Sequence, residues 1–303
     1  MEKQLYGIDL HIHTTSSDGT RTLDETIQDA LNAKLASIAI TDHNQFALKE
    51  PVNFQGMEII PGAEFSTAYY TEKGRLLEVH IVGLFFEGVP KDLWQIFKEI
   101  PVQRKHYVDA IIANLETLGI RIFYEELTNA FPDSNQIGRR HIAELLVKKN
   151  HADSITDAFD RLIGNRSPYW VDSSKFMKYM PMDECVRKIC KNHGIPILAH
   201  PYHYHLEDEE IVKLVKDFKK SAGNAPAGIE VYYSKYGEER REELLKIAKE
   251  FDLYPSAAGD RHAVKDRFEQ GDELLLEAMK EACKARKSTN HIIVCNLKTF
   301  FIG

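Results

Sequence analysis

Residues 9–19 read DLHIHTTSSDG, and this stretch decides most of what the sequence predicts. Side chains two positions apart on a strand point to the same side, so His11 and His13 present two imidazoles to one point. Asp18 adds a carboxylate in the loop that follows. A histidine pair at this spacing is often only structural, but imidazoles grouped with a carboxylate are the usual ligands of divalent Zn, Mn and Fe ions. The stretch therefore predicts a metal site at the carboxyl end of a strand.

Short apolar strands alternate with helices through most of the chain. We expect buried strands at residues 6–12, 36–41, 58–66, 76–86, 195–199, 229–233 and 253–257. We expect helices at residues 22–34, 182–192, 208–220, 238–251 and 273–286, the first opened by a capping box from Thr22 to Glu25. This alternation predicts an α/β fold with mainly parallel strands and helices outside. A final apolar run, residues 292–302, is expected to be a strand without an assigned position.

The alternation is interrupted after Pro90. Apolar residues recur at helical spacing between residues 91 and 149, with little strand signal, and residues 166–181 look irregular. The sequence therefore predicts a small helical domain at residues 101–180. This domain would be inserted into a larger one formed by residues 1–100 and 181–303.

Further candidate ligands lie in or just after predicted strands. They are His43, Glu64, His80, His200, Asp260 and His262. Any one of them alone is more often a hydrogen-bonded structural residue. Independent strands rarely all end in metal-ligand types, however, and the carboxyl ends of barrel strands form the catalytic rim of such folds. The sequence therefore predicts that these side chains share one site.

Together these motifs resemble the PHP (polymerase and histidinol phosphatase) superfamily. DLHIHTTSSDG, TDH at residues 41–43, GAEF at residues 62–65 and AGDRH at residues 258–262 look like the successive motifs of that family. The resemblance covers nearly the whole chain, including the helical insertion. It implies a distorted (β/α)7 barrel with an inserted small helical domain, and phosphoester hydrolysis with bound Mn²⁺, Zn²⁺ or Fe²⁺.

The resemblance also implies how two or three divalent metal ions would be held. The first ion would have four ligands: His11, His13, Glu64 and Asp260. Glu64 would bridge to a second ion, completed by His80 and His200. The third ion would be held by Asp18, His43 and His262. The leaving oxygen would be protonated near this third ion, so its ligands are the expected catalytic residues.

The predicted insertion carries GRRH at residues 138–141, similar to the G-R-x-H stretch of PHP proteins that have an inserted helical domain. The resemblance implies that Arg139 and His141 reach over the metals toward substrate phosphate. A guanidinium suits this role because it pairs with phosphate through two parallel hydrogen bonds. The alternative is a solvated helix start in which Arg140 and Glu144 form an i,i+4 pair.

Residues 199–203 read AHPYH, where the family often has Ala-His-Pro-Gly-Arg. His203 therefore replaces an arginine that would be available for phosphate, and it becomes a candidate substrate contact. Tyr202 and Tyr204 are candidates for stacking on a base.

Residues 41–44 read TDHN, where the family usually has Thr-Asp-His-Asp. Asn44 is expected to change the contacts behind the ligands, and Asp42 is expected to orient His43.

Composition restricts the partners. Lys and Arg total 39 against 46 Asp and Glu, and no basic run stands out, so the broad basic footprint of a long nucleic-acid binder is missing. The N-terminus lacks an apolar signal core, and no apolar run is long enough to span a bilayer. We therefore expect a cytoplasmic protein that does not bind a membrane, and we infer no obligate protein partner.

The expected function is metal-dependent hydrolysis of a phosphomonoester by a metal-activated hydroxide. The insertion resembles that of the PHP branch acting on nucleoside 3′,5′-bisphosphates and 5′ ends of short RNA, so a small nucleotide or short oligonucleotide is the expected substrate. A histidinol-phosphate phosphatase is the alternative enzyme, and the insertion argues against it. A non-catalytic metal-binding sensor is the alternative of another class, and the full ligand set argues against that. A serine or cysteine hydrolase is disfavoured because no nucleophile-elbow motif occurs.

Overall fold

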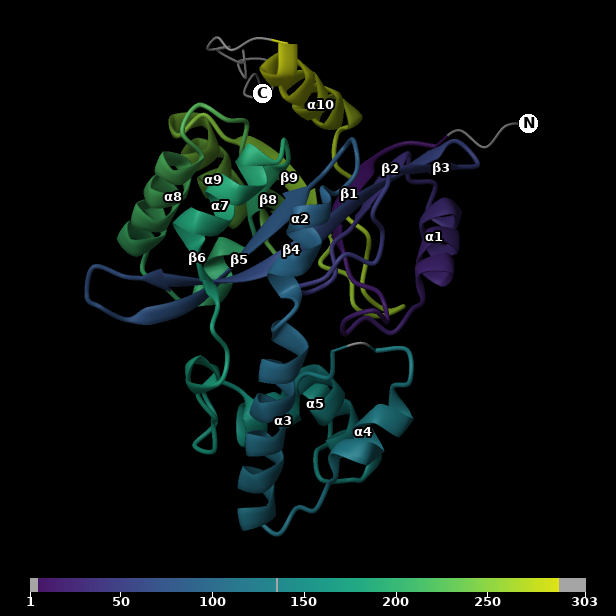
Figure 1. Ribbon diagram of the computed structural model, residues 1–303, viewed down its shortest axis with the longest axis vertical. Coiled ribbons are helices and arrows are strands. Elements are labelled where there is room, and N and C mark those ends of the chain that lie inside the picture. The colour runs from purple at the N-terminus through teal and green to yellow at the C-terminus, as the bar shows by residue number, and fades with distance from the viewer. Residues whose placement is uncertain (1–4, 135, 289–303) are drawn as a thin grey trace.

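A computed structural model of the protein describes residues 5–134 and 136–288 (Figure 1). Within these residues one nine-stranded sheet follows the order β1-β2-β4-β5-β7-β8-β9, with two short strands paired to β4. The main strands are β1 (Ile8–Ile12), β2 (Ser37–Ile40), β4 (Met57–Tyr70), β5 (Leu76–Leu84), β7 (Ile195–Leu198), β8 (Gly228–Tyr233) and β9 (Tyr254–Ala258). The short strands are β3 (Val52–Phe54) and β6 (Met180–Pro181).

The two ends of the sheet meet. Ile12 at the end of β1 bridges to Arg261 just after β9, and His13 N donates to the Arg261 carbonyl at 3.0 Å. This contact brings the carboxyl ends of the first and last strands together. The fold is therefore the distorted α/β barrel predicted from the sequence.

Helices surround the sheet (Figure 1). They are α1 (Leu23–Asn32), α2 (Lys91–Trp94), α3 (Ile100–Thr117), α4 (Tyr124–Ala130), α5 (Arg139–Lys148), α6 (Ile155–Ala158), α7 (Met182–Lys191), α8 (Asp208–Ala222), α9 (Glu238–Glu250) and α10 (Glu273–Ser288). Single turns of tighter or wider helix are η1 (Gln95–Phe97), η2 (Phe159–Ile163), η3 (Ser173–Lys175) and η4 (Pro201–Tyr204). In Figure 1, α1 lies on one side of the sheet, α7 to α9 lie on the other, and α3 to α5 gather below it.

The expectation of mainly parallel strands is right for most of the barrel but wrong for β5. This strand runs antiparallel to both of its neighbours, β4 and β7. The reason is the short connection between β4 and β5, where Thr71 N donates to the Arg75 carbonyl at 2.9 Å. Gly74, at φ +75°, allows this tight turn. A parallel pair needs a crossover of a dozen or more residues, which this hairpin does not provide.

Helices α3 to α6 occupy the part of the chain where the sequence predicts an inserted helical domain. The division into domains at residues 101–180 stays a prediction. The apolar run at residues 292–302, expected to be a strand, lies outside the described residues.

Strand β1 shows how the fold presents polar groups at one point. Ile8, Leu10 and Ile12 are buried in the apolar core. Asp9 and His11 alternate with them and are also fully buried. Because alternate side chains of a strand face opposite sides, the apolar residues fix the direction in which these polar groups point.

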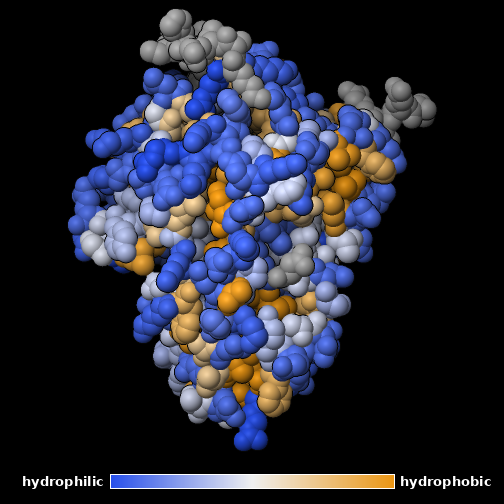
Figure 2. All heavy atoms as spheres, viewed as in Figure 1, coloured by the Kyte–Doolittle hydropathy of each residue, from blue (hydrophilic) through white to orange (hydrophobic). Residues whose placement is uncertain are grey.

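The surface seen in Figure 2 is mainly hydrophilic, with apolar side chains in scattered patches over the sheet and the helices below it. Over the described parts of the chain, none of the helices combines the length and apolar character needed to cross a membrane.

Helix α1 begins as predicted, at the capping box. Thr22 Oγ1 accepts the Glu25 N–H at 3.3 Å, and a Glu25 carboxylate oxygen accepts the Thr22 N–H at 2.9 Å. Replacing Thr22 with Ala should lower the free energy of unfolding by about 1 kcal/mol, because the helix loses a cap acceptor. Replacing Thr22 with Ser keeps the hydroxyl and should cost much less. Urea denaturation of both variants measures the difference, and equal losses would contradict the capping role.

Candidate metal centre and substrate cavities

The carboxylate of Glu64, on β4, lies at the centre of a ring of imidazoles and is fully buried. Its Oε2 atom has three neighbouring nitrogens, at 2.9 Å in His43, 3.2 Å in His13 and 3.3 Å in His11. Its Oε1 atom has two, at 2.8 Å in His80 and 2.9 Å in His200. One carboxylate thus joins histidines that come from separate strands and loops.

Two further carboxylates flank this ring. Asp260 Oδ1 lies 3.4 Å from His13 Nε2 and 3.4 Å from His262 Nδ1. Asp18 Oδ1 lies 3.3 Å from His262 Nε2, and Asp18 Oδ2 lies 3.8 Å from His43 Nε2. Every metal ligand predicted from the sequence is therefore brought to one place.

Within the described residues, three groups have ligand atoms close enough to hold an ion. They are His13, Asp18, His43 and His262; His11, His13 and Asp260; and His43, Glu64 and His80. These groups differ from the implied sets in that His13 and His43 each belong to two of them. His200 is in none of the three, but it contacts Glu64 directly.

A buried atom without a partner supports the presence of cations here. Glu64 Oε2 is buried and accepts no hydrogen bond from the described residues, although three imidazole nitrogens surround it. His200 Nδ1 is also buried without such a partner. A buried polar atom left unpaired costs free energy, and a cation among these groups would remove that cost. The imidazole and carboxylate set therefore fits divalent metal ions.

The carboxylates of the cluster stay ionised. Burial alone would raise the pKa of Glu64, but the surrounding His43, His80 and His11 hold that pKa well below its usual value. Burial would likewise raise the pKa of Asp18, and His262 and His43 keep it well below the usual range. These groups are therefore anionic at neutral pH and ready to bind cations.

Two of the ligand residues have strained backbones. His200, after β7, has φ +28°, and Asp260, after β9, has φ +47°. Non-glycine residues in such conformations cost roughly 1–3 kcal/mol each, and they collect at functional sites. At both strand ends the chain turns sharply, and this turn directs the side chain into the cluster.

Glu230, on β8, was not among the residues predicted from the sequence. It is buried, and its Oε1 atom lies 2.6 Å from His11 Nδ1. Its Oε2 atom accepts the backbone N–H of His200 at 2.7 Å. Glu230 therefore orients one ligand and fixes the backbone of another. The signal was present, because a lone acid inside the apolar strand at residues 228–233 needs a buried partner.

Asp9 joins the two ends of the barrel beneath the cluster. Its carboxylate accepts N–H groups of His11 at 3.2 Å, Gly259 at 2.9 Å and Glu269 at 3.0 Å. Burial raises the pKa of Asp9 to about 7, against the effect of these hydrogen bonds. Asp9 thus ties β1 to the loop after β9, which carries Asp260.

Asp42 organises the loop before Asp18. Its buried carboxylate accepts hydrogen bonds from the backbone and hydroxyl of Thr14, both at 2.8 Å, and from those of Ser17, at 3.1 and 2.5 Å. Asp42 was expected to orient His43. Its hydrogen bonds instead fix the loop that carries Asp18. Asn44 instead bonds the backbone N–H and the hydroxyl of Ser66, at 2.9 and 3.1 Å.

Arg139 lines a cavity that opens onto the cluster. Asp18, His43 and His80 line the same cavity, and so do two more arginines, Arg104 and Arg140. Arg104 comes from α3 and was not predicted from the sequence. Its Nε atom is buried without a hydrogen-bond partner among the described residues. The cavity therefore brings three guanidinium groups next to predicted metal ligands.

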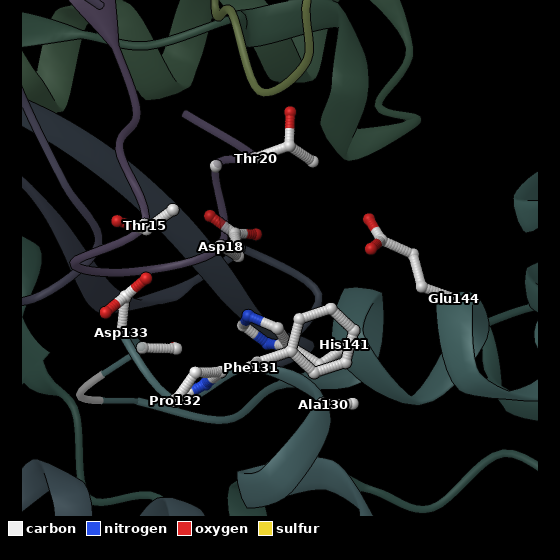
Figure 3. A pocket seen from close by; sticks show the side chains of 11 residues that line it. Thr15, Asp18, Thr20, Ala130, Phe131, Pro132, Asp133, His141 and Glu144 are labelled. Carbon is white, nitrogen blue, oxygen red and sulfur yellow. The ribbon is translucent and has the colours of Figure 1, made fainter. Parts of the chain in front are cut away.

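His141 lies in a different cavity from Arg139, although the resemblance implied that both reach over the metals toward substrate phosphate. It lines a second cavity together with Asp18 and Glu144 (Figure 3). Its Nδ1 atom accepts the Gly138 N–H at 3.0 Å, and burial lowers its pKa to about 4. The ring is thus neutral, with its proton on Nε2. It caps the start of α5 and is buried, so this helix start is not simply solvated.

The expected pair on α5 is also present, since Arg140 Nε lies 3.2 Å from Glu144 Oε1. Arg140 lines the first cavity and Glu144 lines the second. This pair therefore lies between the two cavities.

The segment after His200 contributes one ring to the site and uses two others internally. His203 is exposed and stacks on His200, with ring centroids 4.9 Å apart. The hydroxyl of Tyr204 accepts the His80 N–H at 2.9 Å and donates to the Ala199 carbonyl at 2.9 Å. Tyr202 donates to Glu243 at 2.8 Å. Both tyrosine hydroxyls are thus held by the protein itself, and a substrate contact of His203 stays a prediction.

Known proteins resemble this chain over most of its length. Residues 9–159, which hold the ligands of β1 to β5 and all three arginines, match the PHP domain family. The chain carries a PHP domain. The 5′-3′ exoribonuclease Rnm of Escherichia coli is 27% identical over 276 residues, covering 89% of this chain and 90% of that protein. The 3′,5′-nucleoside bisphosphate phosphatase of Chromobacterium violaceum is 28% identical over 260 residues, covering 84% of this chain and 87% of that protein.

A solved structure has a fold similar to that of this PHP protein. An amidohydrolase from Chromobacterium violaceum, with bound sulfate and no metal, has a TM-score of 0.77 and 23% identity, covering 91% of this chain and 96% of that one. This likeness confirms the barrel fold. Both curated relatives are hydrolases of phosphoric esters, and the PHP protein belongs to the same class of enzyme.

Replacing Glu230 with Gln should weaken Mn²⁺ binding roughly 10–100-fold, because His11 loses the carboxylate that orients it. Titration calorimetry on the metal-free protein measures the affinity. Glu239, exposed on α9, provides the matched control, and its replacement with Gln should leave the affinity unchanged. Unchanged affinity in Glu230→Gln would show that Glu230 does not support the metal centre.

Proposed function

We propose that this PHP protein removes phosphate from a small nucleotide, either a nucleoside 3′,5′-bisphosphate or the 5′ end of a short oligonucleotide. Two or three divalent ions, of Mn²⁺, Zn²⁺ or Fe²⁺, would be held by the predicted ligands. The observation that carries the proposal is the cavity in which Arg104, Arg139 and Arg140 lie beside Asp18 and His43. A substrate with more than one phosphate would use both the cluster and these arginines.

The charge of this cavity suits a second phosphate. Glu78 also lines it, and its pKa is lowered to about 2: burial opposes the shift, but His80, Arg139 and Arg104 outweigh it. Two ionised acids, Glu78 and Asp18, thus stand against three guanidinium groups, which leaves the cavity cationic. Guanidinium pairs with phosphate in two-pronged hydrogen bonds, so an anionic group is favoured here even though the whole protein is acidic.

The exposure of the ligands suggests from which side the substrate enters. His11, His13 and Glu64 are fully buried side chains, whereas Asp18 and His43 are 19% exposed and His262 is 13% exposed. Bound divalent ions supply Lewis-acid charge at the phosphoryl oxygens and lower the pKa of water there. We place the leaving oxygen on the exposed side, where Asp18, His43 and His262 are the catalytic residues.

The two curated relatives support this substrate class by name, one as an exoribonuclease and one as a bisphosphate phosphatase. Histidinol phosphate has a single phosphate, so it would leave the arginine-lined cavity without an anionic partner. A bisphosphate is therefore the better match to the cavity.

Mn²⁺-loaded protein should release phosphate from adenosine 3′,5′-bisphosphate well above its rate on histidinol phosphate, and chelator should abolish this activity. Phosphate release, with and without chelator, measures both. A preference for histidinol phosphate would contradict the nucleotide proposal and leave the metal centre intact. Metal-bound protein that hydrolyses neither compound would contradict the proposal and favour a metal-binding module.

Replacing Arg104 or Arg139 with Ala should lower kcat/KM for adenosine 3′,5′-bisphosphate by about tenfold or more, because each removes a charged hydrogen bond to phosphate. Turnover of p-nitrophenyl phosphate, which has one phosphate, should change much less. Arg187, exposed on α7, is the matched control, and its replacement with Ala should affect neither substrate. Equal losses on both substrates would show that the arginines do not bind a second phosphate.

A further inference from the structure

The second cavity beside the cluster has a lining of its own. Asp18 is the one residue that it shares with the arginine-lined cavity among the described residues. The loop from Thr15 to Thr20 forms one wall, and the end of α4 with the following residues forms the other (Figure 3). A molecule bound at Asp18 could therefore extend into both cavities.

The two cavities differ in chemistry. Phe131 and Pro132 give the second cavity an apolar wall, and Asp133 and Glu144 add carboxylates. None of its described lining residues is Lys or Arg, so it is unsuited to a phosphate. A flat ring and hydrogen-bond acceptors are instead the groups that recognise a heterocycle and its N–H or hydroxyl donors.

The aromatic wall is held in place before any ligand binds. The ring of Phe131 meets that of His141 edge-on, with centroids 4.6 Å apart. His141 is in turn fixed by the Gly138 N–H, and the Arg140 pair holds Glu144 at the boundary between the cavities. A preformed contact surface costs little ordering when a ligand binds.

We propose that this second cavity binds the nucleoside of the substrate, with the base against Phe131 and a base or sugar donor on Glu144. The proposal rests on the proposed function, because the reacting phosphate at Asp18 defines where the nucleoside begins. The two parts of the substrate would then bind in different cavities: the second phosphate among the arginines, and the uncharged nucleoside against the aromatic wall. Stacking accepts every base, so the cavity would select for a base without selecting its identity.

The test compares binding of adenosine 5′-monophosphate and ribose 5-phosphate, which differ by the base. Calorimetry on the Mn²⁺-loaded protein should show the nucleotide binding about tenfold more tightly, as expected for one stacked base. Replacing Phe131 with Ala should bring the two affinities to within about twofold of each other by weakening only the nucleotide. Phe131→Leu keeps apolar volume without the ring and should do the same, whereas Phe131→Tyr should retain the difference.

Phe123, exposed just before α4, provides the control, and Phe123→Ala should leave the ratio unchanged. The inference is overturned if the wild-type protein binds both compounds equally, if it binds neither, or if Phe131→Ala preserves the ratio. An equal loss of both affinities in Phe131→Ala also overturns it, because the ring would then act through His141. Binding does not require turnover, so an absence of bisphosphate hydrolysis would contradict the proposed function and leave this result standing.

Discussion

The buried carboxylate of Glu64 is the constraint around which the rest of the site is arranged. An ionised group without water is expensive unless cations or hydrogen-bond donors surround it. Here imidazoles from β1, β5 and the loops after β1, β2 and β7 approach its two oxygens at 2.8–3.3 Å. The barrel makes this approach possible because its strand ends converge, and metal ions would complete the compensation of charge that the histidines begin.

Other buried carboxylates hold the residues of this cluster in position. Asp9 and Asp42 accept backbone N–H groups that close the barrel and fix the loop of Asp18. Glu230 reaches His11 and the backbone of His200. Each of these carboxylates lies next to a predicted ligand or the loop that carries one, and its hydrogen-bond partners belong to the protein. Such support fixes ring orientation before a metal binds, which is the arrangement that gives metal sites their affinity.

The helices α3 to α5 add guanidinium groups and an aromatic ring beside Asp18. The barrel supplies imidazoles and carboxylates, whereas α3 and α5 supply Arg104, Arg139 and Arg140. The end of α4 supplies Phe131 to the other cavity. Charge is thus distributed unevenly around Asp18, with cations on one side and an aromatic, acidic surface on the other. In the proposed function, this distribution would attract an anionic substrate to an acidic protein and also orient it.

The sequence by itself determined the barrel class, the start of α1 and the full set of candidate ligands. These features are local: a capping box spans four residues, and a ligand that follows a strand is visible as a motif. Tertiary structure alone decided that β5 runs antiparallel, that Arg104 joins Arg139, and that Arg139 and His141 face different cavities. The direction of β5 depends on the length of a turn, and Arg104 becomes part of the site only when distant segments pack, which no local pattern records. The sequence marks Glu230 as an acid that needs a buried partner, but only the packing shows that this partner is His11.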